Sequence, residues 1–147
     1  MLRRLELADM DAAARVHRTA FDQALPSLAG LHTRQEDQWF FRGRVLRTCE
    51  VWGAFDGGSM IGMLAFREDW IDQLYVLPTA QRRGVGTGLL RIAQDASDRL
   101  YLWTFQRNQA ARRFYEARGF ALVRETDGAE NEEREPDALY FWTRPKG

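Results

Sequence analysis

Cysteine, lysine and long apolar runs are scarce in this chain of 147 residues, and each scarcity excludes a class of protein. With Cys49 as the single cysteine, the chain can form no internal disulfide and no cysteine-rich zinc site. It contains no run of roughly 18 apolar residues, and nothing at its N-terminus resembles a signal peptide. We therefore expect a soluble, cytoplasmic protein with no membrane partner and no metal.

The charges balance, which argues against a polyanionic partner. Lysine and arginine together number 21, as do aspartate and glutamate, so the formal net charge is +0. Without an overall positive field, we expect no nucleic-acid partner. The hydrophobic fraction of 45% and the aromatic fraction of 12% suit a globular α/β protein. The length predicts one domain, covering residues 1–147.

Periodicity and turn residues predict a strand, two helices, three strands, a helix, a strand, a helix and two strands. The predicted strands cover residues 2–7, 49–55, 60–67, 71–77, 99–105, 120–125 and 138–143. The predicted helices cover residues 10–21 and 33–46, then a segment ending near 96, then 108–118. Residues 56–59, Asp-Gly-Gly-Ser, are typical of a hairpin turn.

Polar residues predict where the first two helices begin. Asp9 is placed to cap the first helix, and Thr33 and Glu36 have the spacing of a capping box for the second. The pattern of the second helix puts Trp39 and Phe40 on its inner side. His17 falls on the inward stripe of the first helix, as expected of a packed histidine.

The segment 81–88, Gln-Arg-Arg-Gly-Val-Gly-Thr-Gly, lies between a predicted strand and a helix. Its three glycines let a ligand approach the main chain, and a helix N-terminus attracts anions. With the two adjacent arginines, this predicts a phosphate or pyrophosphate site. A strand-to-helix connection that needs small residues for packing is the alternative. A dinucleotide fingerprint fits worse, because Leu89 replaces the third glycine and no acidic residue follows about 20 positions on.

Two runs together resemble one family. Residues 74–86 read L-x-V-x-P-x-x-Q-x-x-G-x-G, which resembles the acetyl-CoA signature of the GNAT N-acetyltransferase superfamily. Residues 108–120 read N-x-x-A-x-x-F-Y-x-x-x-G-F, which resembles the next motif of that family. The order and separation of the two runs also fit. Outside residues 74–120, only the order of the elements agrees.

The resemblance implies a fold and a co-substrate. It implies an α/β fold: a mostly antiparallel mixed sheet of about seven strands with about four helices on its two faces. The strands before and after the glycine-rich turn would splay, and the pantetheine arm of acetyl-CoA would lie in the gap. The main chain of residues 74–76 would bind that arm as a strand edge binds a peptide. The pyrophosphate would lie on the amides of residues 83–88.

The resemblance also assigns individual residues. Cofactor contacts are expected from Leu74, Tyr75, Val76, Gln81, Arg82, Arg83, Gly84, Val85, Gly86, Thr87, Gly88, Asn108, Ala111 and Phe114. Asn108 would also cap its helix. Arginines 107, 112, 113 and 118 around the same helix either face cofactor phosphates or form a solvated basic face. Tyr115 would donate a proton to the departing thiolate; the alternative is a tyrosine that only packs in the core.

The general base is less well indicated. Asp72 is the best-placed carboxylate, because a regular strand would put it on the same face as Leu74 and Val76. Trp70, on that face, could make the surroundings of Asp72 less polar and raise its pKa. The alternatives are a carboxylate that binds a cationic substrate or pairs with an arginine. His32, in the loop between the first two helices, is a second candidate for the base. The alternative is that His32 is a surface histidine with no role in catalysis.

The segment 127–137 is strongly acidic, and we call it the acidic loop. It is either a solvated loop or a border of the acceptor site, where Glu132, Glu133 and Asp137 would favour a cationic amine. In the family the same connection can also serve in homodimer contacts. His32, Trp70 and Glu133 are therefore the predicted substrate-binding residues.

We expect an acetyl-CoA-dependent N-acetyltransferase that acts on a small, cationic primary amine. No Ser-His or Cys-His pair argues for an acyl-enzyme, so direct attack in a ternary complex is expected. A protein N-terminus or lysine is an alternative acceptor. A non-catalytic acyl-CoA-binding or regulatory module and a nucleotide-binding domain are alternatives of a different class, because a fold does not fix a function.

Overall fold

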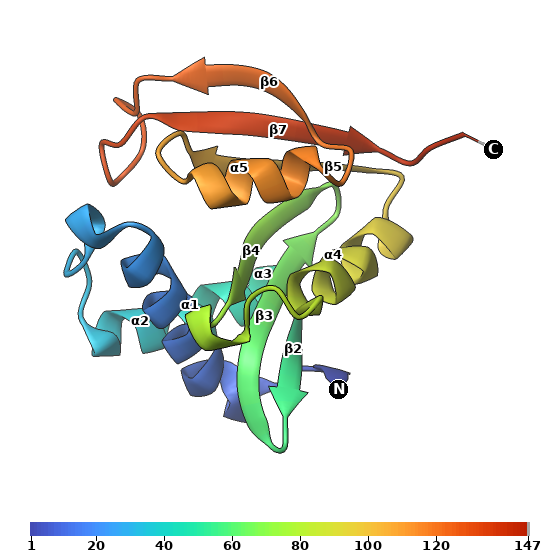
Figure 1. The fold of residues 1–147 in the computed structure, drawn as a ribbon. Helices are drawn as coiled ribbons and strands as arrows, with labels where there is room; N and C mark the ends of the chain where they lie inside the picture. Colours follow the sequence, from blue (N-terminus) through green and yellow to red (C-terminus); the bar gives the residue numbers. More distant parts are fainter. Residues whose placement is uncertain (147) are drawn as a thin grey trace.

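The computed structural model describes residues 1–146, which form a seven-stranded sheet in the order β1-β2-β3-β4-β5-β7-β6 (Figure 1). The strands are β1 (Leu2–Arg4), β2 (Glu50–Asp56), β3 (Ser59–Arg67), β4 (Trp70–Val76), β5 (Arg99–Phe105), β6 (Ala121–Thr126) and β7 (Asp137–Thr143). The pair of β4 with β5 is parallel, and the other neighbours are antiparallel. The predicted mixed sheet and element order are confirmed.

Helices cover both faces of the sheet, and each face has its own core. The helices are α1 (Met10–Ala24), α2 (Arg34–Phe40), α3 (Leu46–Thr48), α4 (Val85–Ala96) and α5 (Gln109–Glu116). Short 3₁₀ turns cover Leu7–Asp9, Pro26–Leu28 and Pro78–Ala80. One core joins α1 to β2 and β3, and the other joins α4 and α5 to β3, β5 and β7. Along residues 1–146, no helix is long and apolar enough to cross a membrane.

Two of the predicted helix starts are confirmed by their hydrogen bonds. Thr33 accepts from the backbone N–H of Glu36, and the Glu36 carboxylate accepts from the backbone N–H of Thr33. The Asn108 side chain accepts from the backbone N–H of Ala111 at the start of α5. Each bond satisfies a backbone donor that the helix leaves free.

The side-chain cap expected from Asp9 is wrong. Its carboxylate instead accepts from the backbone N–H of Glu6 and pairs with Arg3 at 2.9 Å. The Glu6 N–H and the Arg3 guanidinium hold the Asp9 carboxylate on the 3₁₀ turn that precedes α1. The helix therefore begins without the predicted cap.

The prediction that Trp39 and Phe40 face inward is also wrong. They are 60% and 43% exposed, and Phe41, which follows, is fully buried. Asp37 fixes this orientation through an ion pair with Arg18 of α1, whose Nε lies 2.8 Å from the carboxylate. The helix continues beyond α2 as a π-helical turn at Phe41–Val45, which changes the phase of the apolar stripe.

β4 and β5 separate after one residue pair. Trp70 pairs with Tyr101, and no further pair joins these two strands within residues 1–146. The rings of these two residues lie 5.2 Å apart, and Tyr101 lies 4.6 Å from Phe141. This aromatic stack closes one end of the seam between the strands. Beyond it the sheet opens, so the splay implied by the resemblance is confirmed.

The opening leaves one edge of β4 without a strand partner. The Leu77 N–H donates to the Ile61 carbonyl of β3 at 2.8 Å, and Val76 pairs with Gly62. Because N–H and C=O groups alternate sides along a strand, the main-chain groups of Leu74 and Val76 point toward β5. In the gap, the Val76 carbonyl accepts from the Gln81 side-chain amide at 3.1 Å.

His17 provides a test of the packing between α1 and β4. Its ring lies 5.7 Å from Phe21, 5.5 Å from Phe41 and 4.6 Å from Tyr75. The Nδ1 atom is buried and has no hydrogen-bond partner among residues 1–146. Burial, assisted by the charge of Arg18, lowers the pKa of His17 from 6.5 to about 4.

This shift predicts a loss of stability in mild acid. Between pH 6.5 and pH 4 the unfolded chain binds a proton at His17 that the folded chain excludes, so the free energy of unfolding falls as pH falls. The full effect is about 3 kcal/mol below pH 4. Urea unfolding from pH 7 to pH 4 should show wild type losing about that much more stability than His17→Leu. Parallel pH profiles would contradict the assignment.

Candidate active site

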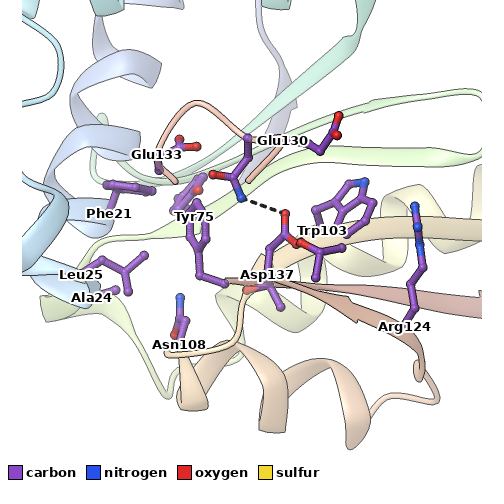
Figure 2. A pocket seen from close by; sticks show the side chains of 14 residues that line it. Phe21, Ala24, Leu25, Tyr75, Trp103, Asn108, Arg124, Glu130, Glu133 and Asp137 are labelled. Carbon is purple, nitrogen blue, oxygen red and sulfur yellow. Dashed lines mark hydrogen bonds between the residues drawn. The ribbon is translucent and has the colours of Figure 1, made fainter. Parts of the chain in front are cut away.

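Two cavities open where β4 and β5 separate. The first, which we call the glycine-turn cavity, has a volume of about 770 Å³ and lies between β4, the start of α4, and α5. The second, the acidic-loop cavity, has a volume of about 710 Å³ and lies between α1, β5 and the acidic loop (Figure 2). Ala24, Tyr75 and Asn108 line both cavities. The cavities therefore adjoin at the side chain of Tyr75.

The glycine-rich turn shapes one wall of the glycine-turn cavity. Gly84 begins α4 in the left-handed region with φ of 79°, a conformation that glycine adopts without strain. A Cβ on Gly86 would lie 3.2 Å from the Phe114 ring. Gly86 thus keeps the cavity open between α4 and α5, and both residues line it.

Most of the residues expected to contact the cofactor line this one cavity. They are Leu74, Tyr75, Val76, Gln81, Arg82, Gly84, Gly86, Thr87, Asn108, Ala111 and Phe114. Tyr115, the expected acid, lines it too.

Three of the expected cofactor contacts lie outside the lining of this cavity. Arg83 points to Asp56, with 3.6 Å between charged atoms. Val85 packs against the sheet core. A Cβ on Gly88 would meet Leu2, and the Gly88 N–H donates to the Gly84 carbonyl at 3.0 Å. Contacts from Arg83, Val85 and Gly88 stay predictions, whereas Gln81, Arg82, Gly84, Gly86 and Thr87 of the same segment line the cavity.

Arginines make the glycine-turn cavity electropositive. Arg118 donates to Thr87 Oγ1 at 3.0 and 2.8 Å and lies 3.9 Å from the Phe114 ring. Arg82, Arg107 and Arg113 also line the cavity. Arg112 points away and donates to the Tyr140 hydroxyl at 2.9 Å. Of the four arginines around α5, sequence reasoning could not tell the three that face the cavity from the one that does not.

Two tyrosines line the glycine-turn cavity, and one of them, Tyr75, also lines the acidic-loop cavity. Tyr115 is 8% exposed, yet it lines the glycine-turn cavity. Burial, and then the neighbouring Tyr75, raise the pKa of Tyr115 well above its usual value. Burial, and then the negative charge of Glu133, raise the pKa of Tyr75 to about 12. Both phenols therefore keep their protons at neutral pH and can act as donors.

Asp72 does not occupy the position that a regular strand would give it. Gln73 pairs with Ala65 and Ile71 pairs with Phe66, so Asp72 is the extra residue of a β-bulge. Its expected shared face with Leu74 is therefore wrong.

Asp72 and Trp70 both lie outside the linings of the two cavities. The Asp72 carboxylate is 2.6 Å from the Arg67 guanidinium. That ion pair is the alternative that sequence reasoning had kept open for this carboxylate. Trp70 instead stacks on Tyr101 at the closed end of the seam.

The acidic loop is folded, so the expectation of a merely solvated loop fits poorly. The Asn131 side-chain amide donates to the Glu135 carbonyl at 2.8 Å and to Asp137 Oδ2 at 3.1 Å. The Gln106 side chain donates to the carbonyls of Thr126 and Asp137, each at 3.0 Å. These bonds fix the loop against the end of β5.

Ion pairs also tie the acidic loop to the segment between α1 and α2. His32 Nε2 lies 2.9 Å from Glu132 Oε1. Arg107 donates to Ser27 Oγ at 2.6 Å and lies 3.3 Å from the Glu135 carboxylate. His32 lies outside the linings of both cavities. It contacts the loop rather than the space where an acceptor would lie.

The acids of the loop divide by their partners. Asp127 accepts from the Ala129 N–H, Glu132 pairs with His32, Glu135 pairs with Arg107, and Asp137 accepts from Asn131 and Thr126. Glu130 and Glu133 have no such partner among residues 1–146, and both line the acidic-loop cavity. The apolar residues Phe21, Leu25, Trp103 and Phe105, which sequence reasoning missed, line the same cavity. No local motif marks them, because they come from separate elements.

No cluster of histidine, cysteine and acidic side chains along residues 1–146 could hold a metal ion. The available chemistry is that of phenols, carboxylates and backbone amides around two adjoining spaces. One space is electropositive and extends along a free strand edge. The other has apolar walls together with polar side chains, the unpaired carboxylates of Glu130 and Glu133, and Arg124. This arrangement suits the binding of two substrates side by side.

Comparison with known proteins identifies the family. The family model described as "Acetyltransferase (GNAT) family" matches residues 11–120, and the chain belongs to this family. Peptidyl-lysine N-acetyltransferase YiaC of Escherichia coli is 32% identical over 56% of this chain and 57% of its own length. A probable N-acetyltransferase of Mycobacterium tuberculosis is matched over 47% of its length, so the chain spans about half the length of the curated relatives it matches.

Solved structures show the same fold at low identity. A GCN5-related N-acetyltransferase from Rhodopseudomonas palustris superposes with a TM-score of 0.81 at 20% identity, covering 98% of this chain and 95% of that one. The PaiA N-acetyltransferase from Thermoplasma acidophilum, solved in complex with coenzyme A, has a TM-score of 0.71 at 16% identity. That match covers 98% of each chain.

Gly128 tests the folded state of the acidic loop. It has a φ of 82°, and an added Cβ would collide with the backbone of Glu135. Gly128→Ala should lower the free energy of unfolding by about 1–3 kcal/mol and speed amide exchange across residues 127–137. Gly43→Ala is the matched control, because its Cβ meets nothing and φ is not positive. Equal effects of the two substitutions would mean that the loop is loose.

Proposed function

We propose that the chain is an acetyl-CoA-dependent N-acetyltransferase that acts on a primary amine. The observation that carries the proposal is the junction at Tyr75, where the glycine-turn cavity meets the acidic-loop cavity in the gap between β4 and β5. A thioester in the first cavity and an amine in the second would meet there. Holding two reactants in this way can by itself supply much of the rate.

The glycine-turn cavity suits acetyl-CoA. The start of α4 and the arginines Arg82, Arg113 and Arg118 offer positive charge to phosphates. The main-chain N–H groups of Leu74 and Val76, which face away from β3, can pair with the pantetheine arm, while the Val76 carbonyl already accepts from Gln81. The PaiA N-acetyltransferase, which has the same fold, was solved in complex with coenzyme A, and this supports the choice of ligand.

Acetyl-CoA supplies an activated thioester, and the amine would attack its carbonyl carbon directly. The departing thiolate needs a proton, and the Tyr115 hydroxyl is the proposed donor. The phenol is protonated at neutral pH, although burial raises the pKa of Tyr115 and so makes it a weaker acid than a free tyrosine. No acyl-enzyme is required.

The acceptor is proposed to be a small, cationic primary amine. Glu130 and Glu133 would attract the ammonium, while Phe21 and Trp103 would cover an apolar stem. A lysine side chain has the same chemistry and is the second candidate, which the peptidyl-lysine activity named for YiaC favours. Turnover of free diamines beside lysine peptides would separate the two.

A non-catalytic acyl-CoA-binding module is the alternative of a different class. Such a module would need only the glycine-turn cavity. The second cavity, with its unpaired carboxylates, favours an enzyme. Release of free thiol from acetyl-CoA in the presence of an amine panel decides between them. A nucleotide-binding domain would instead prefer ATP or NAD.

Gly86→Glu tests the cofactor site. The side chain and its charge would fill the space beside Phe114. Calorimetric titration should show micromolar binding of acetyl-CoA to wild type, no binding of ATP or NAD, and no acetyl-CoA binding to the variant. Gly88→Ala, which faces Leu2 rather than the cavity, is the control and should bind normally. Normal binding by Gly86→Glu would place the phosphate site elsewhere.

Tyr115→Phe tests the proton donor. Turnover should fall by about a hundredfold, because a general acid contributes at least that much. The Kd for acetyl-CoA should change little, since the ring remains. Tyr101→Phe is the control, because Tyr101 lies in the aromatic stack outside both cavities. An unchanged turnover number would remove Tyr115 from the mechanism.

A further inference from the structure

Glu133 differs from the other carboxylates near the junction. Its side chain comes from the acidic loop, lines the acidic-loop cavity and is partly buried. Figure 2 shows it at the end of the cavity where Tyr75 and Phe21 lie, while Glu130 lies toward Trp103. The negative charge of Glu133 acts on Tyr75, the residue shared by both cavities.

Other candidate bases are already engaged or lie elsewhere. Asp72 pairs with Arg67 at the β-bulge, and His32 pairs with Glu132 outside the cavity. Both oxygens of Asp137 accept hydrogen bonds, one from Thr126 and the other from Asn131. A carboxylate whose oxygens already accept bonds is a weaker acceptor for another proton. Glu133 has no hydrogen bond or ion pair of this kind among residues 1–146.

We infer that Glu133 is the catalytic proton acceptor for the amine. This inference rests on the proposed function and adds the group that deprotonates the acceptor. The ammonium of the acceptor would enter between the carboxylate and the Tyr75 ring, with its stem against Phe21.

Two protons leave the acceptor nitrogen during the reaction. An N–H bond of the ammonium breaks and its proton passes to the Glu133 carboxylate, which leaves a neutral amine. The amine lone pair forms the C–N bond at the thioester carbonyl, and collapse of the intermediate breaks the C–S bond. The thiolate takes a proton from Tyr115, and the second proton lost by nitrogen restores the phenol. Glu133 returns its proton to solvent, so one proton is released per turnover.

The loop holds this carboxylate in place from several sides. Glu135, two residues further on, is 9% exposed and is bound by Arg107 at 3.3 Å. Asn131 closes the loop by accepting from the Glu135 N–H at 3.2 Å. These contacts flank Glu133 in sequence without occupying its oxygens. A proton acceptor held on a fixed loop meets the geometric requirement of general base catalysis.

Other charged groups share the surroundings of Glu133 and would affect its proton transfer. Glu130 and Asp137 are on its own loop, Arg124 is on β6, and Tyr75 is on β4. On α1, Arg18 is paired with Asp37 and Asp22, and its charge also acts on Tyr75. Tyr115 lies in the adjoining cavity and His32 on the far side of Glu132.

The experiment compares Glu133→Gln with Glu132→Gln, a change of the same kind at the next residue, whose side chain points to His32. Thiol release would be followed with the amine that wild type acetylates best. At pH 7, Glu133→Gln should lower kcat/KM for the amine about a hundredfold, the size expected for loss of a general base. Its Kd for acetyl-CoA should be unchanged, and Glu132→Gln should stay within about threefold of wild type.

The pH dependence separates proton transfer from charge attraction. A lysine-like amine has a pKa near 10.4, so its neutral fraction rises about tenfold per pH unit between pH 7 and pH 9. The ratio of wild-type kcat/KM to Glu133→Gln kcat/KM should therefore fall by about tenfold per pH unit, because an already neutral amine needs no base.

Three results would overturn the inference while leaving the proposed function intact. The first is a loss of kcat/KM in Glu133→Gln of less than about threefold. The second is a loss of kcat/KM that has the same size at every pH. The third is an equally large and equally pH-dependent loss of kcat/KM in Glu130→Gln. Wild-type protein that binds acetyl-CoA but releases thiol with no amine would instead contradict the proposed function, and the inference with it.

Discussion

The separation of β4 from β5 is the constraint on which the rest of the structure depends. The strands share the single pair Trp70 with Tyr101, and then β4 continues with β3 as its one partner. A buried strand edge normally leaves costly unpaired amides and carbonyls. Here the open edge borders a cavity, so its main-chain groups are available to a ligand. The aromatic stack of Trp70, Tyr101 and Phe141 holds the closed end and so sets where the opening begins.

One opening serves two spaces that differ in their balance of charge. Arg82, Arg107, Arg113 and Arg118 line the glycine-turn cavity, whereas the unpaired carboxylates of the acidic loop line the other cavity together with Arg124. Tyr75 is at the boundary, on the strand whose edge is free. This difference would let the proposed anionic thioester carrier and the proposed cationic amine approach each other without competing for the same surface. The overall net charge of +0 conceals this local arrangement.

Features set by local chemistry were predictable from the sequence, and features set by tertiary contacts were not. The features set by local chemistry depend only on residues that are close together in the sequence. They are the capping residue Thr33, the hairpin at residues 56–59 and the glycine-rich turn. Asp72 was misplaced because one bulged residue reverses which face a strand side chain meets. Trp39 was misplaced because an ion pair between α2 and α1 set the rotation of the helix. The acidic loop was recognised, but its composition could not show that Glu133 lacks a partner while Glu132 has one.

The most direct test of this structural interpretation measures single backbone amides of β4. Amide hydrogen exchange would be followed at Leu74 and Val76, whose N–H groups face the gap, with and without saturating acetyl-CoA. We predict that both amides become strongly protected, while Tyr75, which is already paired with β3, changes little. Unchanged exchange at Leu74 and Val76 in protein saturated with acetyl-CoA would contradict binding along the free strand edge.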